Sequence, residues 1–173
     1  MPKYLVVYYS WTGNTAKVAN LVAATLSADI EEIHDVTPRG GPFAFVTAVV
    51  ASMLKRSSPI LPATKNVADY DAVILGCPVW ASNMATPMRS YITRENPRIK
   101  QVGLFCTLGG SGGKAALARM AALCGRKSMA DLIVERPALA SDTWRGVTET
   151  FALQFQTQQV QQSDAASRGV AAN

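Results

Sequence analysis

The sequence predicts an α/β protein in which a doubly wound parallel β-sheet carries helices on both faces. Two observations predict this fold class. Continuous apolar runs, typical of strands buried on both faces, alternate with stretches in which apolar residues recur every three or four positions, as in amphipathic helices. The length of 173 residues fits one domain with a hydrophobic core of its own.

The first part of the chain predicts two strands with a helix between them. Residues 3–9 form a continuous apolar run and predict the first strand. Residues 14–28 carry apolar positions at helical spacing, so this strand leads directly into the first helix. Residues 30–36 alternate weakly between polar and apolar and predict the second strand.

The later elements continue the alternation to the end of the domain. We predict strands at 71–77 and 101–108, followed by helices at 87–95 and 114–124, then a fifth strand within 129–134 and a final helix from about residue 142. From residue 156 the chain is rich in Gln, Ser and Ala. We therefore predict one domain over 1–155 and a polar C-terminal tail over 156–173, helical at first and partly disordered.

The segment between the second and third strands departs from this pattern. Prolines and glycines open it, and the apolar run from Phe43 to Leu54 predicts a helix of about 13 residues. Lys55 and Arg56 follow and complement the negative C-terminal end of a helix. The helix could pack on the sheet or form a lid or partner surface, including the contact of a homodimer.

Composition and charge narrow the classes of partner. A formal net charge of +5 favours anionic cofactors and acidic partners. The basic residues are scattered and not interleaved with aromatics, so we predict no nucleic-acid surface. No stretch approaches the roughly 20 apolar residues that span a bilayer, so we predict no membrane segment. Cys77, Cys106 and Cys124 read as small buried side chains in a reducing compartment, which predicts a cytoplasmic protein.

A cluster of hydrogen-bond donors lies between the first strand and the first helix. It has the sequence SWTGNT, from Ser10 to Thr15. The start of a helix offers unpaired backbone N–H groups and a positive dipole end, and the hydroxyl and amide side chains add further donors. Helix capping alone explains one such residue but not four in six. The cluster therefore predicts a phosphate-binding loop, with Gly13 allowing the close turn.

Two other nucleotide-binding loops do not fit. A Rossmann fingerprint needs three spaced glycines after the strand, and only Gly13 is present there. The glycine-rich loop before Lys114 would match a Walker loop only with glycine in place of Leu108 and a hydroxyl residue in place of Ala115. We therefore predict no magnesium-dependent NTPase.

Two further loops follow the third and fourth strands and meet the first loop, because the carboxyl ends of parallel strands share one edge of the sheet. The second loop carries Trp80, and the third is rich in glycine. A planar ring between them would meet the indole on one side and backbone N–H groups on the other. Taken alone, Trp80 would more often be a core or rim residue than a ligand contact, but its position between two other candidate loops favours the ligand contact.

These loops resemble those of the flavodoxin family. The family's first loop has the form [ST]-x-T-G-x-T, and residues 10–15 match it. The stretches CPVWASNMATPMRSYI and FCTLGGSGG are similar to its second and third loops. The resemblance covers residues 3–155 and implies a flavodoxin-like five-stranded sheet of order 2-1-3-4-5 that binds FMN non-covalently.

The resemblance also implies roles for individual residues. The phosphate would be held by Ser10, Trp11, Thr12, Gly13, Asn14 and Thr15. The isoalloxazine would be lined by Pro78, Val79, Trp80, Ala81 and Asn83, and its pyrimidine side would meet Thr107, Leu108, Gly109, Gly110 and Ser111. No catalytic acid or base and no metal ligand is implied, because the flavin carries the chemistry. His34, the one histidine, is expected to be structural and away from the flavin.

The chain also differs from the electron-carrier flavodoxins. Those proteins are acidic and usually carry a tyrosine in the third loop, whereas this chain is basic and its third loop has no aromatic residue. Ala81 and Ser82 stand where the carriers often have a glycine. The open glycine loop is more similar to that of flavodoxin-fold quinone and FMN reductases.

Three functions stay open on the sequence. The first is an FMN protein that passes electrons to a redox partner protein. The second is an NAD(P)H-dependent reductase that uses FMN to reduce a small quinone-like acceptor. The third is a binding module of the same fold that no longer holds a flavin.

Overall fold

The computed structural model describes residues 2–36 and 57–170. Five parallel strands form the main sheet, in the order β2-β1-β3-β5-β6. Their bounds are Tyr4–Tyr8 for β1, Asp29–Glu32 for β2, Ala72–Trp80 for β3, Val102–Leu108 for β5 and Asp131–Glu135 for β6. The short β4, Asn83–Met84, pairs antiparallel with β3. The order of the five parallel strands is the predicted 2-1-3-4-5.

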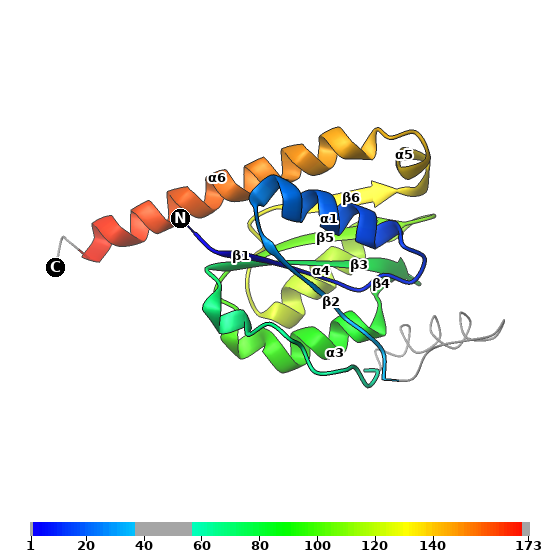
Figure 1. Ribbon diagram of the computed structural model, residues 1–173, viewed down its shortest axis with the longest axis horizontal. Helices are drawn as coiled ribbons and strands as arrows, with labels where there is room; N and C mark the ends of the chain where they lie inside the picture. Colours follow the sequence, from blue (N-terminus) through cyan, green and yellow to red (C-terminus); the bar gives the residue numbers. More distant parts are fainter. Residues whose placement is uncertain (1, 37–56, 171–173) are drawn as a thin grey trace.

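Helices cover both faces of the sheet, as predicted (Figure 1). On one face lie α1 (Asn14–Leu26) and α6 (Trp144–Val170), and on the other lie α3 (Thr86–Glu95) and α4 (Gly113–Cys124). A short helix, α5 (Arg136–Ala140), joins β6 to α6, and two 3₁₀ turns, η1 (Val67–Asp69) and η2 (Asn96–Arg98), occupy connections. The predicted helix from Phe43 to Leu54 lies outside the described residues.

The alternation of side chains along β1 divides the core into two layers. Leu5 and Val7 point to the cluster under α3 and α4, whereas Tyr4, Val6 and Tyr8 point to the cluster under α1 and α6. All five residues are buried, as a central strand with helices on both faces requires. The three cysteines are free and buried, which confirms that prediction.

Two glycines let large aromatic rings lie flat on the sheet. A Cβ atom on Gly76 of β3 would lie 1.9 Å from the Phe105 ring of β5. A Cβ atom on Gly103 of β5 would lie 2.7 Å from the Phe155 ring of α6. Because both rings are fully buried, a side chain at Gly76 would displace the Phe105 ring and one at Gly103 would push Phe155 of α6 away from the sheet.

The second strand is shorter than predicted, ending at Glu32 instead of residue 36. The Ile33 N–H still donates to the Tyr8 carbonyl, but β1 ends there and offers no further partner. The chain beyond pairs with residues 59–61 instead, through the N–H of Leu61 to the carbonyl of His34. An isolated antiparallel bridge joins Asp35 to Ile60.

Two other features differ from the predicted ones. The third strand was predicted to end at residue 77, but it continues to Trp80 because its last two residues pair with β4. The helix α5 was not predicted. The final helix runs through the predicted domain boundary at residue 155 without a break. None of the described helices, α6 included, has the length and apolar character needed to cross a membrane.

Candidate functional site

The first, second and third loops meet at the carboxyl edge of the sheet and enclose a cavity of about 220 Å³. This is where ligands bind in open parallel sheets, beside the point at which the strand order reverses between β1 and β3. The residues that line it are Trp11, Thr12, Asn14, Thr15, Pro78, Val79, Trp80, Thr107, Leu108, Gly109, Arg136 and Leu139. The predicted convergence of the three loops is therefore observed.

The N-terminus of α1 opens into this cavity without a capping side chain of its own. Its N-cap residue, Gly13, has a left-handed backbone with φ of +84°. The Ser10 hydroxyl accepts the Ala16 N–H at 3.2 Å, and the helical ladder begins with Lys17. Within the described residues, the N–H groups at positions 14 and 15 have no acceptor. They are free to donate to an anion.

Some polar side chains of this loop are bonded within the protein, and others are available to a ligand. Thr15 and Thr107 are both buried, and their hydroxyl oxygens lie 2.8 Å apart, which ties the first turn of α1 to β5. The Thr12 hydroxyl and the Asn14 amide line the cavity and make no hydrogen bond within the described part of the chain. A polar ligand can therefore bind them without breaking a native contact.

The aromatic wall of the cavity consists of two tryptophans that meet edge to face. Trp80 is 4% exposed and meets Trp11 and Tyr9 edge to face, with ring centroids 5.7 Å apart in each pair. Trp11 is only half-buried. Trp80 is thus a core residue that lines the cavity with a small part of its surface, and Trp11 offers the larger aromatic surface.

A tight turn holds the second loop in place. Ala81 and Ser82 join β3 to β4 with φ angles of +49° and +57°, a backbone conformation that residues other than glycine seldom adopt. The Arg119 guanidinium donates to the Ser82 carbonyl. Asn83, 3% exposed, accepts the Met84 N–H and an Arg89 N–H through its Oδ1 atom, each at 3.0 Å. These contacts make the turn a fixed wall.

The cysteine beside the second loop is not a nucleophile. Cys77 precedes Pro78 in β3 and is fully buried. Burial raises the pKa of its thiol to about 12, so the thiol stays protonated at neutral pH. The polar groups of the cavity can bind and orient a ligand, but this thiol cannot attack one.

Residues 3–136 match the family model described as flavodoxin. The chain belongs to the flavodoxin family. The resemblance noted in the three loops is therefore confirmed at the level of the family.

Solved structures support the same flavodoxin-like fold. A flavoprotein in complex with FMN from Lactobacillus acidophilus NCFM is 21% identical, with a TM-score of 0.65 over 83% of this chain and 99% of that one. A putative flavoprotein from Bacteroides uniformis ATCC 8492 is also 21% identical, with a TM-score of 0.68 over 84% and 96% of the two chains. At this identity the likeness concerns the fold.

Curated relatives of the chain have names that describe an activity. NAD(P)H dehydrogenase (quinone) 3 of Rhizobium meliloti is 29% identical over 122 residues, which cover 64% of this chain and 55% of the relative. A protein named NAD(P)H dehydrogenase (quinone) from Chromohalobacter salexigens is 29% identical over 117 residues, 64% and 56% of the two chains. The chain thus spans about half the length of the curated relatives it matches.

Ten of the flavodoxin-like site residues predicted from the sequence line the cavity. Six others are not among the described residues that line it: Ser10, Gly13, Ala81, Asn83, Gly110 and Ser111. The first two shape the start of α1, the next two build the turn, and the last two are exposed at the tip of the third loop. Their predicted contacts with a cofactor remain predictions.

Two residues of the cavity wall were missed by sequence reasoning. Arg136 and Leu139 lie on α5, which follows β6 at the same edge of the sheet. A signal was available, because the carboxyl end of the fifth strand must lie at the ligand edge of a flavodoxin-like sheet. The predicted site included the loops after only three of the five strands.

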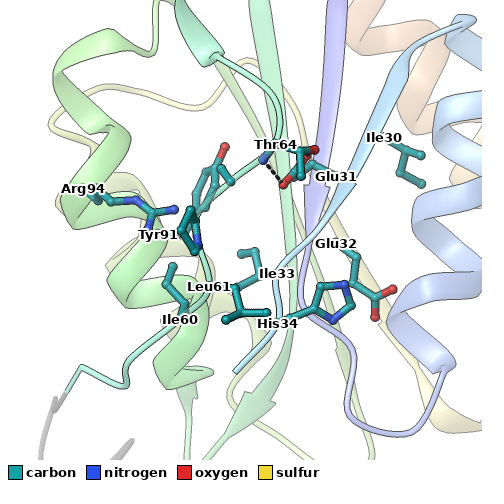
Figure 2. A pocket seen from close by; sticks show the side chains of 12 residues that line it. Ile30, Glu31, Glu32, Ile33, His34, Ile60, Leu61, Thr64, Tyr91 and Arg94 are labelled. Carbon is teal, nitrogen blue, oxygen red and sulfur yellow. Dashed lines mark hydrogen bonds between the residues drawn. The ribbon is translucent and has the colours of Figure 1, made fainter. Parts of the chain in front are cut away.

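A second cavity, of about 250 Å³, lies along β2 and the segment 60–64, with Tyr91 and Arg94 of α3 on its far side (Figure 2). The buried Glu31 carboxylate in its wall accepts the N–H and the hydroxyl of Thr64, at 2.8 and 2.5 Å. His34 lines this cavity and not the one at the carboxyl edge. The histidine is therefore away from the candidate site, as predicted.

Proposed function

We propose that this protein binds FMN non-covalently at the carboxyl edge of its sheet and transfers electrons through it. The observation that carries the proposal is the N-terminus of α1, where the N–H groups of Asn14 and Thr15 have no acceptor within the described residues and face a cavity shared by three loops. A phosphate is the natural ligand of free N–H groups at the positive end of a helix. Membership of the flavodoxin family supports the same cofactor.

The residues present fit the phosphate of FMN. The backbone N–H groups of Asn14 and Thr15 and the side chains of Thr12 and Asn14 are donors without a partner in the described chain. A bound dianion needs several fixed donors to replace the water molecules that it loses, and these groups form such a set. At about 220 Å³, the cavity is smaller than typical cofactor pockets. It would enclose part of FMN and leave the rest at its mouth.

The remaining walls suit a flat ring. Trp11, Pro78 and Val79 present apolar surface, and the backbone from Thr107 to Gly109 presents polar groups next to it. FMN, when bound, supplies the electron and hydride chemistry, while the protein supplies binding, orientation and exclusion of water. The fixed turn at Ala81 and Ser82 keeps the wall from moving as the ligand enters.

A second function within the same proposal is the NAD(P)H-dependent reduction of a quinone-like acceptor. The third loop favours it, because Gly109, Gly110 and Ser111 are exposed and no aromatic residue of that loop covers the cavity mouth. The curated relatives named NAD(P)H dehydrogenase (quinone) also support it. The alternative is a carrier that passes electrons to a partner protein.

The first experiment is a fluorescence titration of flavin-free protein with FMN and with riboflavin, which lacks the phosphate. We expect FMN to bind and riboflavin to bind more weakly. The Asn14→Ala variant should weaken FMN binding about tenfold, the effect of one hydrogen bond to a charged group. Asn20→Ala is the matched control, because Asn20 is exposed on the same helix and bonds only the Ala16 carbonyl. A wild-type protein that binds no FMN would be the flavin-free module instead.

The second experiment separates reductase from carrier. FMN-loaded protein is titrated without oxygen, first with NADPH and NADH and then with dithionite, while the flavin absorbance is followed. Rapid bleaching by a nicotinamide identifies a reductase. Bleaching by dithionite alone identifies a carrier and contradicts the reductase.

A further inference from the structure

The cavity at the carboxyl edge contains a cationic side chain that lies outside the three predicted loops. Of the described residues that line it, only Arg136 is ionised at neutral pH. The first loop, where a phosphate would bind, contributes neutral donors only. A dianion in this cavity would therefore meet one full positive charge, and Arg136 carries it.

The sheet register places Arg136 beside the third loop. Glu135, the last residue of β6, is paired with Leu108, the last residue of β5. The residues that follow these two strands, Arg136 after β6 and Gly109 after β5, are therefore neighbours. A Cβ atom built on Gly109 would lie 3.9 Å from Cδ of Arg136, so the aliphatic part of the arginine lies against this glycine.

The short helix α5 directs this side chain toward the cavity. It begins at Arg136, and the proline that follows favours the first turn of a helix. Leu139 is three residues later, on the same face of the helix, and lines the same cavity. Two residues of one helical face thus contribute to the wall, which makes α5 a fourth component of the site.

The guanidinium of Arg136 has no protein partner in the described chain. No carboxylate pairs with it there, whereas the nearby Arg145 is bound to Asp142 at 3.4 Å and lies 4.8 Å from the centre of the Trp144 ring. An arginine in a ligand cavity with no acid to neutralise it raises the local potential and attracts an anion. The planar guanidinium also fits two phosphate oxygens at once.

We propose that Arg136 is a phosphate-binding residue of this site, adding a charged contact to the neutral donors at the start of α1. The proposal rests on the proposed function and extends it. The phosphate could belong to FMN or to a nicotinamide dinucleotide that approaches the bound flavin. Both carry the same chemical group.

The test compares Arg136→Gln with the wild type in titrations with FMN and riboflavin at low and high salt. We expect Arg136→Gln to weaken FMN binding about tenfold at low salt and to leave riboflavin binding unchanged. The difference should shrink at high salt, because Arg136 is exposed and its charge is screened. Arg136→Lys should recover part of the affinity. Arg145→Gln is the control and should match the wild type.

A second titration identifies the source of the phosphate. FMN-loaded protein is titrated with NADP⁺ and the shift of the flavin absorbance is recorded. If FMN binding is unchanged in Arg136→Gln but NADP⁺ binding is weakened, Arg136 binds the dinucleotide phosphate. Unchanged binding of both ligands overturns the proposal. A wild-type protein that fails to bind FMN contradicts the proposed function itself and removes the basis for this one, so the two failures are distinct.

Discussion

The strand β5 belongs to both the core and the candidate site, and its residues have opposite roles in these two regions. In its middle, Gly103 and Phe105 pack against α6 and β3 so closely that one additional carbon on Gly103 would collide with Phe155. At its end, the chain passes from the buried Leu108 to the exposed Gly109, beside donors that have no partner among the described residues. In the middle of β5 the side chains pack against other parts of the protein, whereas its carboxyl end borders a cavity that a ligand can fill. Substitutions in the core should therefore reduce stability, and those in the cavity should mainly reduce affinity.

The largest expected effect on stability is that of Phe155→Ala. The Phe155 ring is fully buried against Gly103 and meets the Tyr4 ring edge to face at 5.8 Å. Its removal leaves a cavity and should lower the free energy of unfolding by about 3–5 kcal/mol, measured by urea denaturation. Leu153→Ala, on the same helix at a position that is 53% exposed, should change it by less than about 0.5 kcal/mol. Equal losses in both variants would contradict the comparison.

Gly76→Ala should come next, because it adds a carbon where none fits. The new Cβ would lie 1.9 Å from the Phe105 ring, and the strain should cost about 3 kcal/mol in thermal or urea unfolding. The additional change Phe105→Leu should restore part of the loss. Gly146→Ala has open space around it in α6 and should instead stabilise the protein by about 0.5 kcal/mol.

Thr15→Val tests a contact where the core meets the candidate site. It removes one of two buried hydroxyl groups that bond each other at 2.8 Å and leaves that of Thr107 without its partner. We expect a loss of about 1–2 kcal/mol in the free energy of unfolding. The double variant with Thr107→Val should recover most of it, because no unpaired hydroxyl remains. A double variant less stable than Thr15→Val would show that these hydroxyls do not act as a pair.

The smallest effect should come from Tyr8, whose hydroxyl donates to Glu32 at 3.0 Å. Burial, with the charge of Glu32, raises the pKa of Tyr8 from 10.0 to about 12. The folded state thus favours the protonated phenol, so its contribution to stability is complete below pH 10 and is lost as the pH rises to about 12. Denaturation curves across this range should fall less steeply for Tyr8→Phe than for the wild type. Parallel curves would refute the assignment.

Local sequence signals predicted much of the fold but not its exceptions. The parallel α/β architecture follows from the alternating runs, the strand order was implied by the resemblance to the flavodoxin family, and the first loop follows from six adjacent residues. The extension of β3 to Trp80 depends on pairing with the two-residue strand β4, which has no periodicity to detect. Trp80 was accordingly expected in a loop and is instead a buried strand residue. Likewise, α5 has only five residues, too few for a helical pattern.

The sequence by itself determined that the chain forms a parallel α/β sheet and that a turn rich in hydrogen-bond donors follows its first strand, because both depend on residues close together in the chain. Only the tertiary structure decided which aromatic surface the cavity exposes and that Arg136 enters it. Those outcomes depend on strand register: Leu108 pairs with Glu135, and Trp80 pairs with Asn83. Register is set by packing across the whole sheet, so contacts between segments distant in sequence place Arg136, the one charged side chain among the described residues that line this site.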